Sequence, residues 1–504
     1  MTLTRRMLLA GLASGLGEAT LAQGARLPTL GRAGAALVPA MVTNAVAAPA
    51  SARVGAPSAE DLIRAADLGG DVAYALADAR TGLVLETRAG GKALPPASTA
   101  KTITALYALD TLHAEARFKT RLIATGPISG GQIRGDLILA GGGDPTLDTD
   151  DLAAMARALR ARGVTGITGR FLVWAGALPF AHEIAGDQPE HVGYNPAVSG
   201  INLNYNRVQL VWARGQNGYR LGMDAASEHI APKVYSVRVT LANRKSPLFT
   251  YAEHDGREEW TVAAASLSQR GSRWLPVRRP DLYAGDVFQT LARAQGTPLP
   301  APQPVQTLPG GEVVVDHDSR ALRDILREML KYSNNMTAEA VGMAASLGRG
   351  QRGDIRASAR AMTDWLRSAS GAQGARFVDH SGLGVASRIP PAEMVSAIVG
   401  LGGRAGLRPI LKRIPLRDAQ GRVQDNHPIR VDAKTGTLNF VSTLTGYMTA
   451  PDGTDLVFAI STANMGLRQA AGRVERPEGS RAWVGRSKRL QQQLIERWGM
   501  VYGR

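Results

Sequence analysis

Three short groups of polar residues contain the side chains that acyl transfer to a serine requires. They are Ser98-Thr99-Ala100-Lys101, Ser333-Asn334-Asn335 and Lys434-Thr435-Gly436. A serine hydroxyl is a weak nucleophile and needs a base within hydrogen-bond reach. A lysine three residues further along a helix lies on the same face as the serine. The spacing therefore predicts Ser98 as the nucleophile and Lys101 as its base.

Lys101 can accept a proton only in its neutral form, so its pKa must be lowered by burial or by a nearby cation such as Lys434. Attack by Ser98 would place negative charge on the carbonyl oxygen of the substrate. Backbone N–H groups stabilise such an oxyanion when they are already oriented towards it. The N–H of Ser98, at the start of its helix, is one candidate donor.

The other two groups predict a substrate-binding role and a proton relay. Ser333 and Asn335 follow a strongly periodic helical segment, and a loop there can direct two short polar side chains into a cleft. We expect Ser333 to relay a proton to the leaving amine and Asn335 to hold the substrate amide. A lysine charge and a hydroxyl suit a carboxylate, so Lys434 and Thr435 are expected to bind the C-terminus of a peptide.

Each residue also has an ordinary structural interpretation. Ser98 and Asn335 would serve as helix caps, and Lys434 as a charge at a strand edge. Lysine occurs only nine times in the chain, and composition predicts a Lys-Thr-Gly sequence about 0.05 times by chance. Capping does not explain why all three motifs occur together and in this order.

Periodicity predicts an antiparallel sheet flanked by helices, an α+β fold. Apolar positions 103, 106, 109 and 112 recur at helical spacing after Ser98. Alternating segments bounded by turn residues predict strands at 71–77, 83–88, 132–140, 429–434, 441–447 and 456–462. Helical spacing predicts further helices at 148–162, 322–331, 354–369, 390–401 and 482–498.

Composition excludes several other classes of protein. The chain has no cysteine, and its eight histidines show no HExxH spacing, so we expect no disulfide and no structural metal. The net charge of +16 favours anionic partners. Basic runs with interleaved aromatic residues are absent from the sequence, which argues against nucleic acid. Beyond the leader, no segment has the 18 uncharged apolar residues typical of a stable membrane span.

Residues 1–50 are expected to be an export signal and a disordered leader. Arg5-Arg6 precede a short apolar stretch, as in twin-arginine signals. Cleavage could follow Ala22 or Ala47, and a soluble N-terminal helix is the alternative. Export by this route predicts a periplasmic location.

The three motifs together resemble those of penicillin-binding protein 4 type D-alanyl-D-alanine carboxypeptidases and endopeptidases, the class C low-mass group. Further segments resemble the same family, namely Gly135-Asp136-Leu137, Gly141–Leu147, Tyr194-Asn195-Pro196, Asn202–Asn206 and Asp379–Leu383. The resemblance implies cleavage of D-alanyl peptides and cross-links in peptidoglycan, covalent inhibition by β-lactam antibiotics at Ser98, and no cofactor. It also implies a second oxyanion donor, the N–H of Thr437, so the expected substrate-binding residues are Thr435, Gly436 and Thr437.

By the same resemblance, a β-lactamase/transpeptidase-like domain is split by a large, mostly β insertion that forms two extra domains. The expected boundaries are 51–120 for its first part, 121–310 for the insertion and 311–504 for its second part. The proline-rich segment 298–309 is the clearest predicted linker. Two rival functions stay open, namely a β-lactamase or esterase on the same scaffold and a wall-binding module without activity. Penicillin turnover would indicate the first, and loss of a catalytic group the second.

Overall fold

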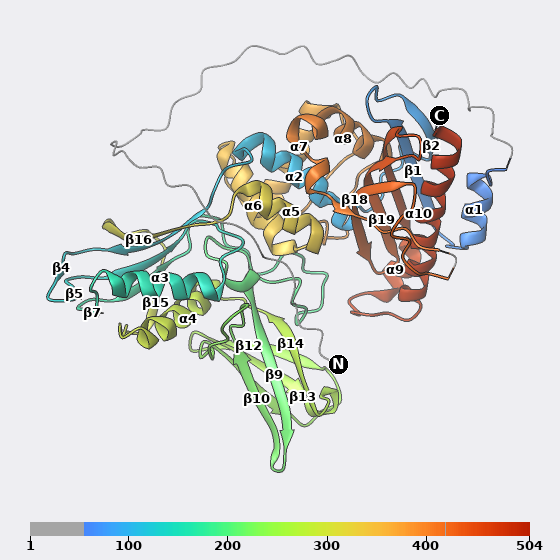
Figure 1. The fold of residues 1–504 in the computed structure, drawn as a ribbon. Coiled ribbons are helices and arrows are strands. Elements are labelled where there is room, and N and C mark those ends of the chain that lie inside the picture. The colour runs from blue at the N-terminus through green and yellow to red at the C-terminus, as the bar shows by residue number, and fades with distance from the viewer. Residues whose placement is uncertain (1–54, 419, 504) are drawn as a thin grey trace, which may run out of the picture. The chain divides into compact units, whose positions relative to one another are not determined.

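A six-stranded antiparallel sheet carries the last of the three motifs in the computed structural model of the protein (Figure 1). The structure describes residues 55–418 and 420–503, so the predicted leader and export signal lie outside the described residues. The strands, in spatial order, are β17 (Lys412–Arg413), β18 (Arg430–Leu438), β19 (Val441–Thr449), β20 (Asp455–Ala463), β1 (Asp71–Asp78) and β2 (Val84–Arg88).

Helices cover both faces of this sheet, which explains why its central strands β19 and β20 are buried almost throughout. Alternate residues of β1 point to opposite faces: Ala75 and Ala77 belong to one core cluster, and Tyr74 and Leu76 to another. The first face packs against α8 (Pro391–Ala405), and the same core cluster includes residues of α2 (Ala100–Leu112), α5 (Leu322–Tyr332), α6 (Asn335–Gly348) and α7 (Ile355–Ser370). The second face packs against α1 (Ala59–Ala66) and the long C-terminal α10 (Ser480–Tyr502), drawn in red in Figure 1. Short α9 (Met465–Ala471) precedes α10.

The chain leaves this body after α2 and builds a second sheet before it returns at α5. This sheet has the order β15 (Pro302–Val305), β8 (Phe171–Trp174), β6 (Leu137–Gly141), β3 (Lys119–Ala124) and β16 (Glu312–Asp318). Its apolar core includes residues of α3 (Thr149–Ala161) and α4 (Pro280–Ala294). Beside it lies the small sheet of β4 (Ile128–Ser129), β5 (Gln132–Ile133) and β7 (Gly166–Ile167).

Two three-stranded sheets complete the inserted region (Figure 1, green). One contains β10 (Gly218–Asp224), β9 (Arg207–Gly215) and β14 (Arg270–Pro276). The other contains β11 (Val237–Ala242), β13 (Arg257–Ala263) and β12 (Phe249–His254). Helix α4 was not predicted in this mostly β region; Pro280 begins it at a position where the missing N–H costs nothing.

The prediction of a linker at 298–309 was wrong, because Pro302–Val305 form strand β15. Pro302 pairs with Phe171 and Pro304 with Val173 in parallel register. Strand β15 is at the edge of its sheet, where a residue without an N–H can be accommodated. Among the described residues, no helix has both the length and the apolar character needed to cross a bilayer.

Candidate active site

Ser98 lies in a short 3-10 turn, Ala97–Thr99, that leads directly into α2. The turn is fixed by Pro96, whose carbonyl oxygen accepts hydrogen bonds from the hydroxyls of Thr99 at 2.6 Å and Thr443 at 2.7 Å. Ala97 has a φ of 46°, in the left-handed region that costs a non-glycine residue energy. The hydroxyl of Ser98 makes no capping bond to α2, so the capping interpretation of this serine is not supported.

Lys101 is fully buried one turn further along, and its Nζ donates three hydrogen bonds. The acceptors are Ser98 Oγ at 3.1 Å, Asn335 Oδ1 at 2.7 Å and the carbonyl oxygen of Ser381 at 2.8 Å. Burial lowers the pKa of Lys101 to about 7, although the charges of Glu339 and Asp379 act in the opposite direction and raise it. A lysine with this pKa is partly neutral at physiological pH and can therefore act as a base.

Glu339 and Asp379 are buried acids beside Lys101, and neither was predicted as a site residue. Glu339 accepts hydrogen bonds from the N–H groups of His380 at 3.0 Å and Ser381 at 2.8 Å. Asp379 accepts bonds from Gly382 and Ser387 and so holds the same loop. Burial, and secondly the charge of Asp379, raises the pKa of Glu339 to about 8. A single glutamate inside the apolar stretch 336–345 was the sequence signal that could have revealed it.

The junction between α5 and α6 presents Ser333 and Asn335. Asn334 is the N-cap of α6 and accepts a hydrogen bond from the N–H of Thr337 at 3.0 Å. The side chain of Asn335 is therefore not used as a cap: its Oδ1 accepts from Lys101, and its Nδ2 donates to the carbonyl oxygen of Tyr194 at 2.9 Å. Tyr194 belongs to the inserted region, which thus contacts the site directly.

Lys434 is buried on β18 and faces the same junction. Its Nζ donates to Ser333 Oγ at 3.0 Å and to the carbonyl oxygen of Thr435 at 2.6 Å. Burial, followed by the charges of Lys101 and Lys412, lowers the pKa of Lys434 well below its usual value. With 1% of its surface exposed, Lys434 is not the solvated edge charge of the alternative interpretation.

The outer edge of β18 is open beyond its short pairing with β17, which reaches no further than Ala433. The N–H of Ile414, next to β17, donates to the carbonyl oxygen of Val431, so odd-numbered residues of β18 direct their backbone groups to this edge. Thr435 and Thr437 are both exposed there, and Thr437 lines the cleft. The hydroxyl of Thr435 has no hydrogen-bond partner within the described chain.

Gly436 permits β18 to approach the turn that holds Ser98. A Cβ atom at this position would lie 2.1 Å from Thr443 Oγ1, 2.8 Å from the carbonyl oxygen of Pro96 and 3.0 Å from the backbone nitrogen of Ser98. All three distances are too short for a side chain. The glycine therefore sets the distance between the strand edge and the serine.

A cleft of about 1970 Å³ opens in front of Ser98, Ser333, Asn335 and Thr437. Lys101 and Lys434 are buried behind these residues and do not line it. Arg388 lines the cleft too, and its guanidinium donates to the carbonyl oxygen of Ser387 at 2.8 Å.

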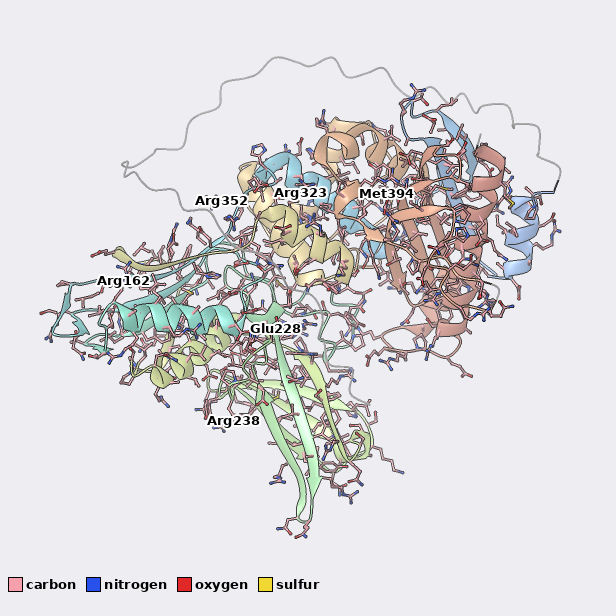
Figure 2. The ribbon with its side chains drawn as sticks, in the orientation of Figure 1. Arg162, Glu228, Arg238, Arg323, Arg352 and Met394 are labelled. Carbon is pink, nitrogen blue, oxygen red and sulfur yellow. The ribbon has the colours of Figure 1, made fainter. Side chains whose placement is uncertain are left out.

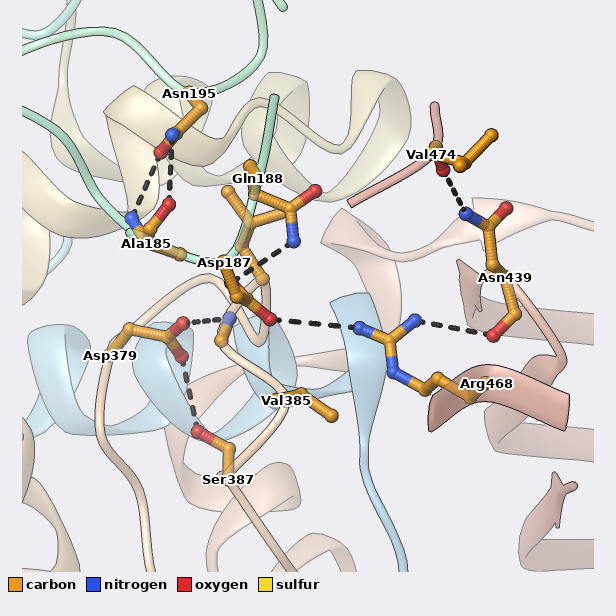
Figure 3. A network of polar contacts seen from close by, with 12 residues as sticks. Ala185, Asp187, Gln188, Asn195, Asp379, Val385, Ser387, Asn439, Arg468 and Val474 are labelled. Atoms are coloured by element: carbon orange, nitrogen blue, oxygen red, sulfur yellow. Dashed lines mark hydrogen bonds and ion pairs between the residues drawn. The ribbon is translucent and has the colours of Figure 1, made fainter. Parts of the chain in front are cut away.

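One wall of the cleft joins the inserted region to the strand–helix body (Figure 3). Arg468 forms an ion pair with Asp187 of the insertion at 3.9 Å and donates to the carbonyl oxygen of Asn439 at 3.2 Å. Asn439 in turn donates to the carbonyl oxygen of Val474 at 3.1 Å. Figure 3 shows these contacts in sequence, from Asp187 through Arg468 and Asn439 to Val474. The structure thus brings together Ser98, Lys101, Ser333, Asn335 and Lys434 at the base of the cleft, with Gly436 and Thr437 at its edge and Thr435 beside them.

Comparison with known proteins places this chain in a family. The family model described as the D-Ala-D-Ala carboxypeptidase 3 (S13) family matches residues 58–482. A D-alanyl-D-alanine carboxypeptidase of Actinomadura sp. (strain R39) is 28% identical over 433 residues, 76% of each chain. The D-alanyl-D-alanine carboxypeptidase DacB of Haemophilus influenzae is 24% identical over 421 residues, 79% of this chain and 86% of its own.

The crystal structure of penicillin binding protein 4 (dacB) from Haemophilus influenzae has a similar fold, with a TM-score of 0.70 and 20% identity over 87% of this chain and 99% of the other. These findings confirm the predicted family resemblance, the α+β fold class and the enzyme class. The chain belongs to the D-Ala-D-Ala carboxypeptidase 3 (S13) family and is a serine peptidase, a hydrolase.

Proposed function

We propose that the protein removes the terminal D-alanine from peptidoglycan stem peptides, and also hydrolyses D-alanyl cross-links, through an acyl-enzyme on Ser98. One observation carries the proposal: the Nζ of a fully buried lysine, Lys101, lies 3.1 Å from Ser98 Oγ. This pairing supplies a nucleophile and a base whose pKa of about 7 suits the task.

In the first step Ser98 Oγ attacks the carbonyl carbon of the penultimate D-alanine, and its proton passes to Lys101. The oxygen of the tetrahedral intermediate receives hydrogen bonds from the N–H groups of Ser98 and Thr437, which the short approach at Gly436 keeps close together. Asn335 Nδ2 and the open edge of β18 hold the peptide backbone. These hydrogen-bond donors are therefore oriented before the substrate binds.

In the second step the C–N bond breaks, and the leaving amine must gain a proton. Ser333 donates its proton to that amine and recovers one from Lys434 Nζ, 3.0 Å away. The exposed hydroxyl of Thr435 binds the carboxylate of the leaving D-alanine, and the charge of Lys434, buried behind the cleft, attracts it. The proton that Lys101 took from Ser98 passes through solvent to Lys434, so that Lys101 is neutral again and Lys434 is charged. Water then attacks the ester carbon and gives a proton to Lys101, which returns it to Ser98 Oγ as the ester C–O bond breaks and the shortened peptide leaves. Side chains of this protein and one water molecule supply every group that reacts with the substrate, so the reaction needs no cofactor.

β-Lactams are proposed to acylate Ser98 because their strained amide presents the same carbonyl. The Haemophilus influenzae penicillin binding protein 4 of similar fold has a structure complexed with a β-lactam. A long-lived adduct is expected, in contrast to a β-lactamase, and the complete set of Ser98, Lys101, Ser333, Asn335 and Lys434 argues against a binding module without activity. We further propose that export by the twin-arginine route delivers the protein to the periplasm, where this substrate is found.

Mass spectrometry of the intact protein after incubation with a penicillin tests the proposal. We expect one adduct, which peptide mapping assigns to Ser98, and none in Ser98→Ala. A Ser98→Ala variant that still carries the adduct would refute the nucleophile assignment. Release of a signal fragment and recovery of the mature chain from a periplasmic extract would test the location, and retention of the full chain in the cytoplasm would contradict it.

A further inference from the structure

The wall of the cleft formed by the loop after α9 and by the start of α10 is strongly basic. Among the described residues that line the cleft, the acidic ones are Asp187 and Glu475. The basic ones are Arg388, Arg468, Arg473, Arg476, Arg481, Arg486, Lys488 and Arg489. Five of these, here called the basic wall, are exposed: Arg473, Arg476, Arg481, Lys488 and Arg489.

The side chains of the basic wall have no ion-pair or hydrogen-bond partner within the described chain. The two acids of the cleft are already paired elsewhere. Glu475 accepts from Arg273 at 3.0 Å and lies 3.2 Å from His191 Nε2, while Asp187 pairs with Arg468. Glu478 adds one exposed carboxylate to the same loop. The basic wall is therefore not neutralised from within the protein.

Helix geometry makes the basic wall continuous with the catalytic cleft. Arg481 and Lys488 are seven residues apart, two turns on the same face of α10, and Gly485 lies between them without a side chain to cover the groove. The opposite face of α10 buries Trp483, Leu490 and Leu494 against the sheet. The charges consequently point into a groove that begins at Ser98.

Several like charges along one groove repel one another, and a groove with low-dielectric walls concentrates their field. A D-alanyl dipeptide terminus carries one carboxylate, which Lys434 and Thr435 already receive in the proposed reaction. The basic wall fits an anion that is much longer and carries repeated charges. Peptidoglycan has that chemistry, because neighbouring stem peptides along a glycan strand each carry free carboxylates.

We propose that the basic wall binds carboxylates of stem peptides neighbouring the one at Ser98, so that the enzyme acts on polymeric peptidoglycan in preference to isolated peptides. This inference rests on the proposed function for its substrate. An anionic lipid surface is the competing occupant, and comparison of binding to sacculi with binding to lipid vesicles distinguishes the two.

The test compares a variant Arg473→Glu/Arg476→Glu/Arg481→Glu with a control Arg162→Glu/Arg238→Glu/Arg352→Glu of equal net charge. The three control arginines are exposed, do not line the cleft and are labelled in Figure 2. Co-sedimentation with purified sacculi measures binding without catalysis. Acylation of Ser98 by penicillin reports, separately, on the proposed chemistry.

The basic-wall variant is expected to lose about tenfold in binding to sacculi and in turnover of them, within the range of electrostatic steering. The basic-wall variant should lose more binding to sacculi than the control variant does. Its rate of penicillin acylation should change less than its binding to sacculi. Added salt should weaken wild-type binding towards the level of the variant.

Equal binding of the two variants to sacculi would overturn the inference. It would also be overturned if the wild type bound vesicles of phosphatidylglycerol and did not bind sacculi. Failure of the wild type to form a penicillin adduct would instead refute the proposed chemistry. The comparison of the two variants in binding to sacculi would still test the basic wall.

Discussion

Replacing Asn335 by aspartate should move the acid limb of the acylation rate to higher pH. The substitution preserves the shape of the side chain and places a negative charge where Oδ1 now lies, 2.7 Å from Lys101 Nζ. At an effective dielectric constant of about 20, unit charges at this separation attract by ~6 kcal/mol, an upper bound for the change. Carboxylates close to a cation shift its pKa by about 1–3 units in practice.

The sign follows from which form of Lys101 reacts. Only the neutral amine accepts the proton of Ser98, and a neighbouring carboxylate stabilises the charged form. In the wild type, with the pKa of Lys101 at about 7, the rate should fall about tenfold per pH unit below that value and level off above it. For Asn335→Asp we expect the limb at about pH 8–10 and a rate at pH 7 that is lower by about 5- to 500-fold.

The assay is the second-order rate of acylation by a chromogenic cephalosporin or a labelled penicillin, measured across pH by stopped flow or mass spectrometry. Asn335→Ala is the matched control, because it removes the same contacts without adding charge. It should lower the plateau and leave the limb near pH 7. If the limb of Asn335→Asp coincides with that of Asn335→Ala, Lys101 is not the titrating base.

Three further changes test other parts of the site. Gly436→Ala places a Cβ 3.0 Å from the nitrogen of Ser98. We expect penicillin acylation to slow by about 10²-fold and the free energy of unfolding, measured by thermal unfolding, to fall by about 1–3 kcal/mol. Acylation at the wild-type rate would contradict the close approach. Because its own pKa is raised to about 8, Glu339 is only partly charged near pH 7. Glu339→Gln removes that partial charge, which raises the pKa of Lys101, so the acid limb should move slightly to lower pH, and a shift upwards would refute this. Arg278→Lys should raise KM for a D-alanyl peptide more than it lowers kcat; unchanged KM would show that the insertion does not position substrate.

The reasoning for the last of these lies in how Arg278 holds the loop that carries Tyr194. Its buried guanidinium donates to the carbonyl oxygens of His182 at 2.9 Å, Asn195 at 2.8 Å and Glu190 at 2.8 Å. An ammonium group cannot reach three such acceptors in one plane. The loop should therefore loosen, and with it the contact from Tyr194 to Asn335.

The catalytic constellation could be predicted from the sequence because its chemistry depends on local spacing. Ser98 and Lys101 are placed by one helical turn, and Asn335 follows a cap that Asn334 supplies. The helices of the main body have a clear helical period, and β1 and β20, which are buried on both faces, are nearly continuous apolar runs bounded by turn residues. Their predicted positions lie within a few residues of the observed ones.

The remaining features depend on contacts between distant segments, which a single sequence does not reveal. Strand β15 looks like a linker because its prolines break the strand pattern, and only its position at a sheet edge makes it possible. Glu339 looks like an ordinary helix residue until the loop at His380 packs over it. The contact from Tyr194 to Asn335 joins residues 141 positions apart.

That long contact bears on why the insertion is part of the enzyme and not a separate attachment. Asn335 has one polar atom on Lys101 and the other on the carbonyl oxygen of Tyr194, so its orientation is set from both sides. Arg468 makes a second connection, between Asp187 of the insertion and the turn after β18. A side chain fixed at both ends loses little entropy when substrate binds, which favours precise placement of the base. Removal of the insertion should therefore free Asn335 and impair acylation at Ser98, although no residue of the insertion reacts.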